Sequence, residues 1–163
     1  MTAPQPPPGS TVHPGVEGWT IDGSGDDESV LDAATALLDA ELPDPRFVSS
    51  DYLRWAYREN PLGRAWERHQ QVPDGDSTKL VAHYVIIPRR FRGPGGTRSE
   101  GAWSLNAVVR TGHQRARHFT RIGLEIYADA AAGRSFVVGH DKSTGAVVKY
   151  MAGASSVRSR CDS

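Results

Sequence analysis

The feature of the sequence that most constrains its fold is a helical pattern with a strand pattern on each side. Apolar or small side chains recur at the spacing of one helix face at Phe119, Ile122, Gly123, Ile126, Tyr127 and Ala130. Before this helix, residues 102–109 alternate between apolar and other side chains, which is typical of a half-buried strand. Residues 135–139 then form a short apolar run. This order predicts a right-handed crossover between two parallel strands that lie side by side.

Composition excludes several classes of protein. The chain has 163 residues, with 19 Lys and Arg against 19 Asp and Glu, so a broad nucleic-acid-binding surface is not expected. The single cysteine, Cys161, can form neither an intrachain disulfide nor a cysteine metal cluster, and the histidines lack metal-site spacing. No apolar run reaches the roughly 18 residues of a membrane helix. We therefore expect a cytoplasmic protein with a packed core and no metal.

The two ends of the sequence differ from its middle. Residues 1–15 are rich in proline and poor in apolar side chains, which predicts a disordered arm. Residues 152–163 are mostly small or polar and are expected to form a tail. This leaves residues 16–151 as one α/β domain, in which a mixed central sheet is flanked by helices.

Local patterns predict the other elements of this domain. They are a strand at 19–21, a helix with a capping box from Ser29 to Asp32, a helix from Ser49 or Ser50 to Asn60, a hairpin of strands at 65–72 and 79–88, and a last helix at 143–151. The Gly- and Arg-rich residues 89–99 are expected to form a loop. Strand 79–88 is apolar except for His83, so it should be covered on both faces. We interpret Trp55 and Tyr57 as core residues, and His83 as a core or cleft residue.

A basic turn precedes the amphipathic helix. It carries Arg110, His113, Arg115, Arg117, His118 and Arg121, with no acidic residue among them. A helix N-terminus collects free backbone N–H groups and attracts anions, so this turn is suited to a pyrophosphate. A solvated loop without a ligand and a nucleic-acid contact are the two other interpretations.

Three segments of the chain resemble the GNAT superfamily of acyl-CoA N-acyltransferases. Residues 51–65 contain WxYxxNPxG, with Trp55, Tyr57, Asn60, Pro61 and Gly63 as the shared residues. Residues 108–123 occupy the place of the acyl-CoA signature V-x-P-x-x-(Q/R)-x-x-G-x-(G/A), which Val109 and Gln114 match. Residues 140–151 resemble the turn into the last helix of the family. The resemblance covers roughly residues 51–151.

The second segment departs from the family signature. Thr111 stands in the proline position, Arg117 in that of the first glycine, and Phe119 in that of the second small residue. Glycine suits the first of these positions because the phosphates approach the main chain closely there. The long side chain of Arg117 could block them, or Arg115 or Arg117 could bind them through bidentate contacts. The sequence leaves both possibilities open.

The resemblance implies an N-acetyltransferase with acetyl-CoA, or another acyl-CoA, as co-substrate and a small-molecule or protein amine as acceptor. It implies that a backbone N–H between Leu105 and Ala107 polarises the thioester carbonyl. It further implies that the tyrosine at position 150, Tyr150, protonates the departing thiolate. The cofactor-binding residues predicted in this way are Leu105, Ala107, Val109, Gln114, Arg115 and Arg117.

The end of the sequence supports an alternative. The family fold normally continues with further strands, and residues 152–163 are too short and too polar to supply them. The C-terminal strands are therefore expected to be missing, which would leave strand 135–139 uncovered and lead either to a homodimer through that edge or to low stability. The alternative function is a catalytically weak or inactive remnant of the fold that acts as a CoA-binding or interaction module.

Overall fold

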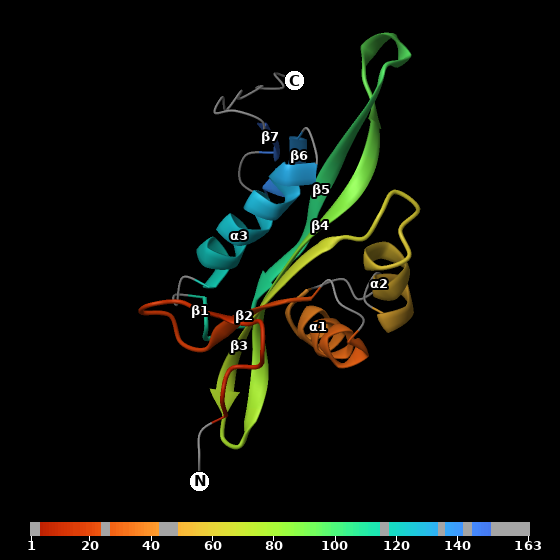
Figure 1. Ribbon diagram of the computed structural model, residues 1–163. Coiled ribbons are helices and arrows are strands. Elements are labelled where there is room, and N and C mark those ends of the chain that lie inside the picture. The colour runs from red at the N-terminus through yellow and green to blue at the C-terminus, as the bar shows by residue number, and fades with distance from the viewer. Residues whose placement is uncertain are drawn as a thin grey trace.

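The fold is a seven-stranded sheet with helices on both faces (Figure 1). The computed structural model describes residues 4–23, 27–42, 49–114, 118–133, 136–141 and 145–150. The strands, neighbours in chain order, are β1 (Thr11–Val12), β2 (Trp19–Asp22), β3 (Trp66–Asp74), β4 (Ser77–Arg92), β5 (Arg98–Val109), β6 (Phe136–Asp141) and β7 (Gly145–Tyr150). The helices α1 (Glu28–Glu41) and α2 (Ser50–Tyr57) cover one face, and α3 (His118–Gly133) covers the other.

The crossover predicted from the sequence is confirmed. β5 and β6 are parallel neighbours, with Ala102 opposite Val137 and Ser104 opposite Gly139, and α3 connects them. The other neighbouring strands pair antiparallel. The sheet is therefore mixed, as the α/β prediction requires.

β4 is buried on both faces, which also confirms the prediction for residues 79–88. Val85 and Ile87 pack with Leu31, Leu37 and Leu53 in the core under α1 and α2. On the other face, Ala82, Tyr84 and Ile86 pack with Ile122, Ile126 and Ala130 of α3. β4 therefore holds the two layers of helices together.

The predicted helix at 143–151 is wrong. Residues Gly145–Tyr150 form β7, which pairs antiparallel with β6 from Asp141 opposite Gly145 to Phe136 opposite Tyr150. The adjacent β-branched residues Val147 and Val148 favour an extended chain. The expectation that the edge of strand 135–139 is uncovered is wrong for the same reason, because β7 supplies one of the strands thought to be missing.

The predicted loop at 89–99 is mostly a hairpin. β4 continues to Arg92 and β5 begins at Arg98, so the two strands form a ribbon that projects beyond the helices (Figure 1). The tip is closed by a hydrogen bond from the Gly93 N–H to the Thr97 carbonyl at 2.8 Å. Exposed arginines leave no apolar pattern along the ribbon, which is extended by backbone pairing and crossed by an ion pair between Arg90 and Glu100.

Two smaller expectations also fail near α1 and α2. The cap of α1 is Asp27, whose side chain accepts hydrogen bonds from the Ser29 N–H and hydroxyl, so the predicted capping box is absent. Trp55 is 49 % exposed and is not a core residue, whereas Tyr57 is fully buried as predicted. Among the described helices, none is long and apolar enough to cross a membrane.

Within the proline-rich segment, Thr11 and Val12 pair with Thr20 and Trp19. The domain boundaries otherwise stay a prediction.

Candidate functional site

β5 stops pairing with β6 partway along its length, and shortly after that point it bulges away from β4 over two residues. Its pairing with β6 reaches Ser104 opposite Gly139. Its pairing with β4 passes from Leu105 opposite Val85 to Val108 opposite His83. Asn106 and Ala107 therefore have no register partner on the described strands, which defines a β-bulge. Such a bulge directs backbone polar groups out of the ladder, at the point where two parallel strands diverge.

Asn106 holds the bulge in an unusual backbone conformation. Its φ of 50° makes it the one non-glycine residue with positive φ in the described part of the chain. Asparagine tolerates this region better than most residues. Its side-chain Nδ2 donates a hydrogen bond to the Tyr57 hydroxyl at 2.6 Å, and Tyr57 lies at the end of α2.

The WxYxxNPxG segment fixes α2 in place. The Ala65 N–H donates to the Tyr57 carbonyl at 2.7 Å, and the Asn60 amide lies 3.4 Å from the Pro88 carbonyl of β4. The side-chain Oδ1 of Asn60 accepts a hydrogen bond from the Leu62 N–H at 2.9 Å. These bonds explain why the motif contains these residue types, because together they place the Tyr57 hydroxyl under the β5 bulge.

The chain then turns from β5 into α3. The Arg110 N–H donates to the Val81 carbonyl at 2.8 Å, and the Thr111 hydroxyl donates to Glu41 at 2.8 Å. His118, the first residue of α3, is buried, and neither ring nitrogen has a hydrogen-bond partner among the described residues. Burial, followed by the charge of His113, lowers the pKa of His118. A buried imidazole beside free helix N–H groups provides polar groups that suit an anionic ligand.

The structure brings some of the predicted site residues together. Leu105, Ala107 and Val109 lie at the bulge or beside it, and Gln114 is exposed in the following turn. Arg115 and Arg117 lie outside the described residues. Tyr150 is the last residue of β7 and pairs with Phe136, at the end of β6 away from Gly139. Its backbone is therefore remote from the bulge, and its catalytic role stays a prediction.

Sequence reasoning missed a set of hydroxyl groups on the other face of the sheet. The Ser104 hydroxyl donates to the Tyr84 hydroxyl at 3.0 Å, which donates to that of Tyr127 at 3.0 Å. Burial raises the pKa of Tyr84, so its phenol stays protonated. Ser104 is also the last β5 residue paired with β6. Asn106 was missed as well, although a polar residue with αL tolerance inside a strand pattern is a recognisable sign of a bulge.

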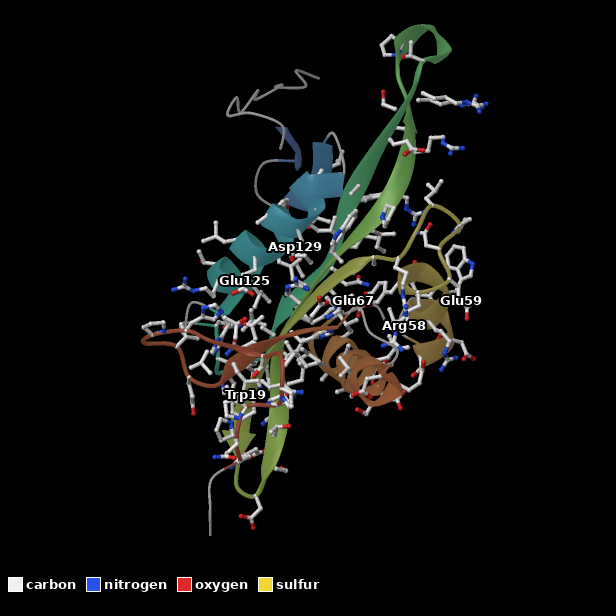
Figure 2. The ribbon with its side chains drawn as sticks, viewed as in Figure 1. Trp19, Arg58, Glu59, Glu67, Glu125 and Asp129 are labelled. Atoms are coloured by element: carbon white, nitrogen blue, oxygen red, sulfur yellow. The ribbon has the colours of Figure 1, made fainter. Side chains whose placement is uncertain are left out.

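A separate groove of about 520 Å³ lies between the N-terminal strands and α3. Glu125 and Asp129 lie on the side of α3 that faces β2 (Figure 2). Arg68 pairs with both Asp22 and Asp129, and His13 Nε2 lies 2.5 Å from Glu125 Oε1. Of the predicted site residues, Leu105, Ala107, Val109 and Gln114 are described with their side chains, and none of these four lines the groove. Within the described residues, no group of three or more His, Cys, Asp or Glu side chains is arranged to hold a metal ion.

Comparison with known proteins gives a match at the level of structure. No protein-family model matches the sequence, and no curated protein matches it significantly. A structure of a probable N-acyltransferase from Enterococcus faecalis superimposes on 77 % of this chain, with a TM-score of 0.57 and 13 % identity. The chain has a GNAT-like fold. It spans 29 % of that Enterococcus protein. A structure of a mutant protein from Bacillus halodurans also superimposes on this chain, with a TM-score of 0.51 and 12 % identity. The match covers 74 % of this chain and 80 % of the Bacillus protein.

Proposed function

We propose that this chain transfers an acyl group, with acetyl as the simplest case, from an acyl-CoA to an amine. The observation that carries the proposal is the bulge at Asn106 and Ala107, which lies where the parallel strands β5 and β6 diverge. A thioester carbonyl placed there would meet the backbone N–H groups of Asn106 and Ala107, two residues that have no register partner on β4. Preorganised donors of this kind stabilise the charge that develops on a carbonyl oxygen during acyl transfer.

The proposed reaction is a direct displacement. The amine nitrogen attacks the thioester carbon and forms the C–N bond, while the carbonyl oxygen takes negative charge at the bulge. The C–S bond then breaks, and CoA leaves as a thiolate. One amine proton passes to a base through water, and the thiolate takes a proton from an acid or from water. The family resemblance suggests Tyr150 as this acid, although its backbone lies at the end of β6 away from the bulge. No covalent enzyme intermediate is required.

The CoA phosphates are proposed to bind at the start of α3. The ring nitrogens of buried His118, which have no hydrogen-bond partner among the described residues, support this, together with the N–H groups that the first turn of a helix leaves without an intrahelical partner. The basic residues Arg110, Arg115 and Arg117 would add charge-assisted contacts. The turn itself contains no acidic residue, although Glu41 of α1 accepts a hydrogen bond from Thr111 and lies near Arg110.

The second candidate is an inactive GNAT-like module that binds CoA weakly or interacts with a partner. Arg117 in the position of a signature glycine favours this candidate. The two candidate functions share the same fold and differ in whether the chain catalyses acyl transfer.

The deciding experiment compares Ala107→Pro with Ala107→Ser. Proline removes the backbone N–H at the bulge, whereas serine keeps it. Loss of one oxyanion donor costs roughly a hundred- to a thousandfold in kcat. We expect Ala107→Pro to lose about this much at an unchanged Kd for acetyl-CoA, and Ala107→Ser to stay near the parent rate. Circular dichroism must show that both variants are folded.

Product should be followed by mass spectrometry over a panel of amines. The chain has its own thiol at Cys161, and a thiol reagent would detect that group along with released CoA. If the parent chain transfers the acyl group and both Ala107 variants do so at the same rate, the bulge has no role in the reaction. Binding of acetyl-CoA without transfer to any amine would favour the inactive module.

A further inference from the structure

A row of buried polar side chains runs through the core and ends at the bulge. Asn106 Nδ2 lies 2.6 Å from the Tyr57 hydroxyl, which lies 3.3 Å from His83 Nε2. His83 Nδ1 lies 3.2 Å from His69 Nδ1, and His69 Nε2 lies 3.5 Å from Glu67 Oε2. We name these five residues the buried row. They come from β5, α2, β4 and β3, so the fold assembles the row from distant parts of the sequence.

The row has one consistent direction of hydrogen bonding. The amide nitrogen of Asn106 can only donate, so the Tyr57 oxygen accepts from it and directs its own proton to His83 Nε2. A neutral His83 then carries its proton on Nδ1 and donates it to His69 Nδ1. His69 therefore carries its proton on Nε2, which faces the carboxylate of Glu67.

Glu67 is the acidic residue at the other end of the row. Its side chain is fully buried, and neither carboxylate oxygen has a hydrogen-bond partner among the described residues. A methyl group built on Gly23 would lie 1.8 Å from His69 Nε2, so the main chain after β2 closes over this ring. Figure 2 shows Glu67 in the interior, between the sheet and the helices α1 and α2. A carboxyl oxygen beside His69 Nε2 can accept a hydrogen bond from that nitrogen, which favours the tautomer of His69 with its proton on Nε2.

Stability alone does not explain the row. Four of its members, Tyr57, Glu67, His69 and His83, have no exposed surface, and burying polar groups with incomplete partners is unfavourable. Apolar side chains would fill the same space more favourably. The opposite end of the row holds the one described non-glycine residue with positive φ, at the position where the backbone leaves the ladder. Polar networks and backbone strain of this kind are characteristic of functional sites.

We infer that the buried row positions the acyl-transfer centre, with Glu67, His69, His83 and Tyr57 acting through Asn106 on the backbone of the bulge. This inference rests on the proposed function and identifies the residues that hold its carbonyl-binding groups in place. These are positioning residues, because none of them needs to touch the acyl group. The tie between Asn106 and Tyr57 keeps the bulge open and fixes the direction of the neighbouring N–H groups.

Tyr57→Phe is the most direct test, because it removes one hydroxyl and leaves the ring in the core. We expect kcat to fall about ten- to a hundredfold while Kd for acetyl-CoA stays within about twofold, because small displacements of reacting groups have effects of this size. Ser50→Ala removes a hydroxyl from the same helix that bonds Asp32 of α1 and lies outside the row, so it should leave kcat unchanged. Asn106→Gly allows positive φ without the tie and should lose less activity than Asn106→Ala.

A double-mutant cycle tests whether the row acts as one unit. Glu67→Gln should lower kcat like Tyr57→Phe, and the double variant should be no slower than the slower single variant. Additive losses, or a Tyr57→Phe variant as fast as the parent, would overturn the inference while leaving the proposed function intact.

A structural measurement keeps the inference testable if the parent chain shows no transfer. The proposed function would then fail, and the Ala107 amide resonance in a ¹⁵N-labelled sample would decide the inference. Tyr57→Phe and Glu67→Gln should both shift that resonance and speed its hydrogen exchange, whereas Ser50→Ala should not. An Ala107 resonance that stays the same in all three variants would overturn the inference.

Discussion

At the scale of single residues, buried imidazoles should make stability depend on pH. Burial and the neighbouring His69 lower the pKa of His83 well below its ordinary value of 6.5, and the pKa of His118 is lowered as well. As pH falls through about 6.5, the unfolded chain binds protons that the folded chain does not, so the free energy of unfolding decreases. Each such histidine contributes a slope of up to about 1.4 kcal/mol per pH unit.

Chemical denaturation at several pH values between 7 and 5 measures this slope. We expect His83→Gln to show a smaller slope than the parent chain, because one of the depressed imidazoles is gone. Equal slopes in the two proteins would show that His83 is already protonated in the folded state.

Substitutions of Arg117 distinguish its two interpretations, as a ligand of the CoA phosphates or as an obstruction to them. If its guanidinium binds CoA phosphates, Arg117→Ala should weaken acetyl-CoA binding about tenfold, since a charge-assisted hydrogen bond contributes roughly 1.5–3 kcal/mol. Arg98→Ala, on the exposed ribbon, is the matched control and should bind like the parent. Tighter binding by Arg117→Gly would instead identify the arginine as an obstruction and favour the inactive module. Calorimetric titration distinguishes these results.

The sequence could predict that Tyr57 is buried and could not predict its partner. Helical spacing and the Asn-Pro stop define the buried side of α2, because both are local signals. The bond to Asn106 joins residues 49 positions apart and depends on where the bulge falls in β5. His83 was similarly recognised as a polar residue in an apolar strand, while its contact with His69 depends on the register between β3 and β4.

At the scale of elements, β2 approaches β3 closely at a glycine. Gly18 has φ of 78°, and a methyl group built on it would lie 1.8 Å from the Gln71 carbonyl oxygen. Gly75 has φ of 63° and open space around it. Gly75→Ala should lower the free energy of unfolding by about 1–2 kcal/mol, because alanine is strained in a left-handed backbone conformation. Gly18→Ala should lose about 1–3 kcal/mol more, because the main chains must separate. Urea denaturation measures both free energies of unfolding. Similar decreases in the two variants would show that β2 can move away from β3 with little loss of stability.

The two elements that sequence patterns assigned wrongly share a physical cause. β7 is six residues long, and its pairing with β6 determines its structure more than local preference does. The outer part of the β4–β5 ribbon has exposed arginines and glycines, so it lacks the alternation that marks a half-buried strand. The crossover was predictable because long, strongly periodic segments give the clearest signals.

At the scale of the whole molecule, β7 changes where a second copy would bind. It covers the outer edge of β6, and it is the last strand at that end of the described sheet. The homodimer expected from the sequence stays a prediction, and we now expect it to form through β7. Light scattering should give the mass of a dimer, and Val147→Lys should shift the chain toward monomer because a charged edge opposes strand pairing. A parent chain that is monomeric at every concentration would contradict this prediction.

The central claim is that this GNAT-like chain binds an acyl-CoA, and calorimetric titration with acetyl-CoA tests it most directly. We predict saturable binding of one acetyl-CoA per chain, with an affinity that decreases as salt is raised, because the phosphates are proposed to meet basic groups at the start of α3. Coenzyme A without the acetyl group should bind at the same site. A folded chain that releases no heat with either ligand at low and high salt would contradict the account.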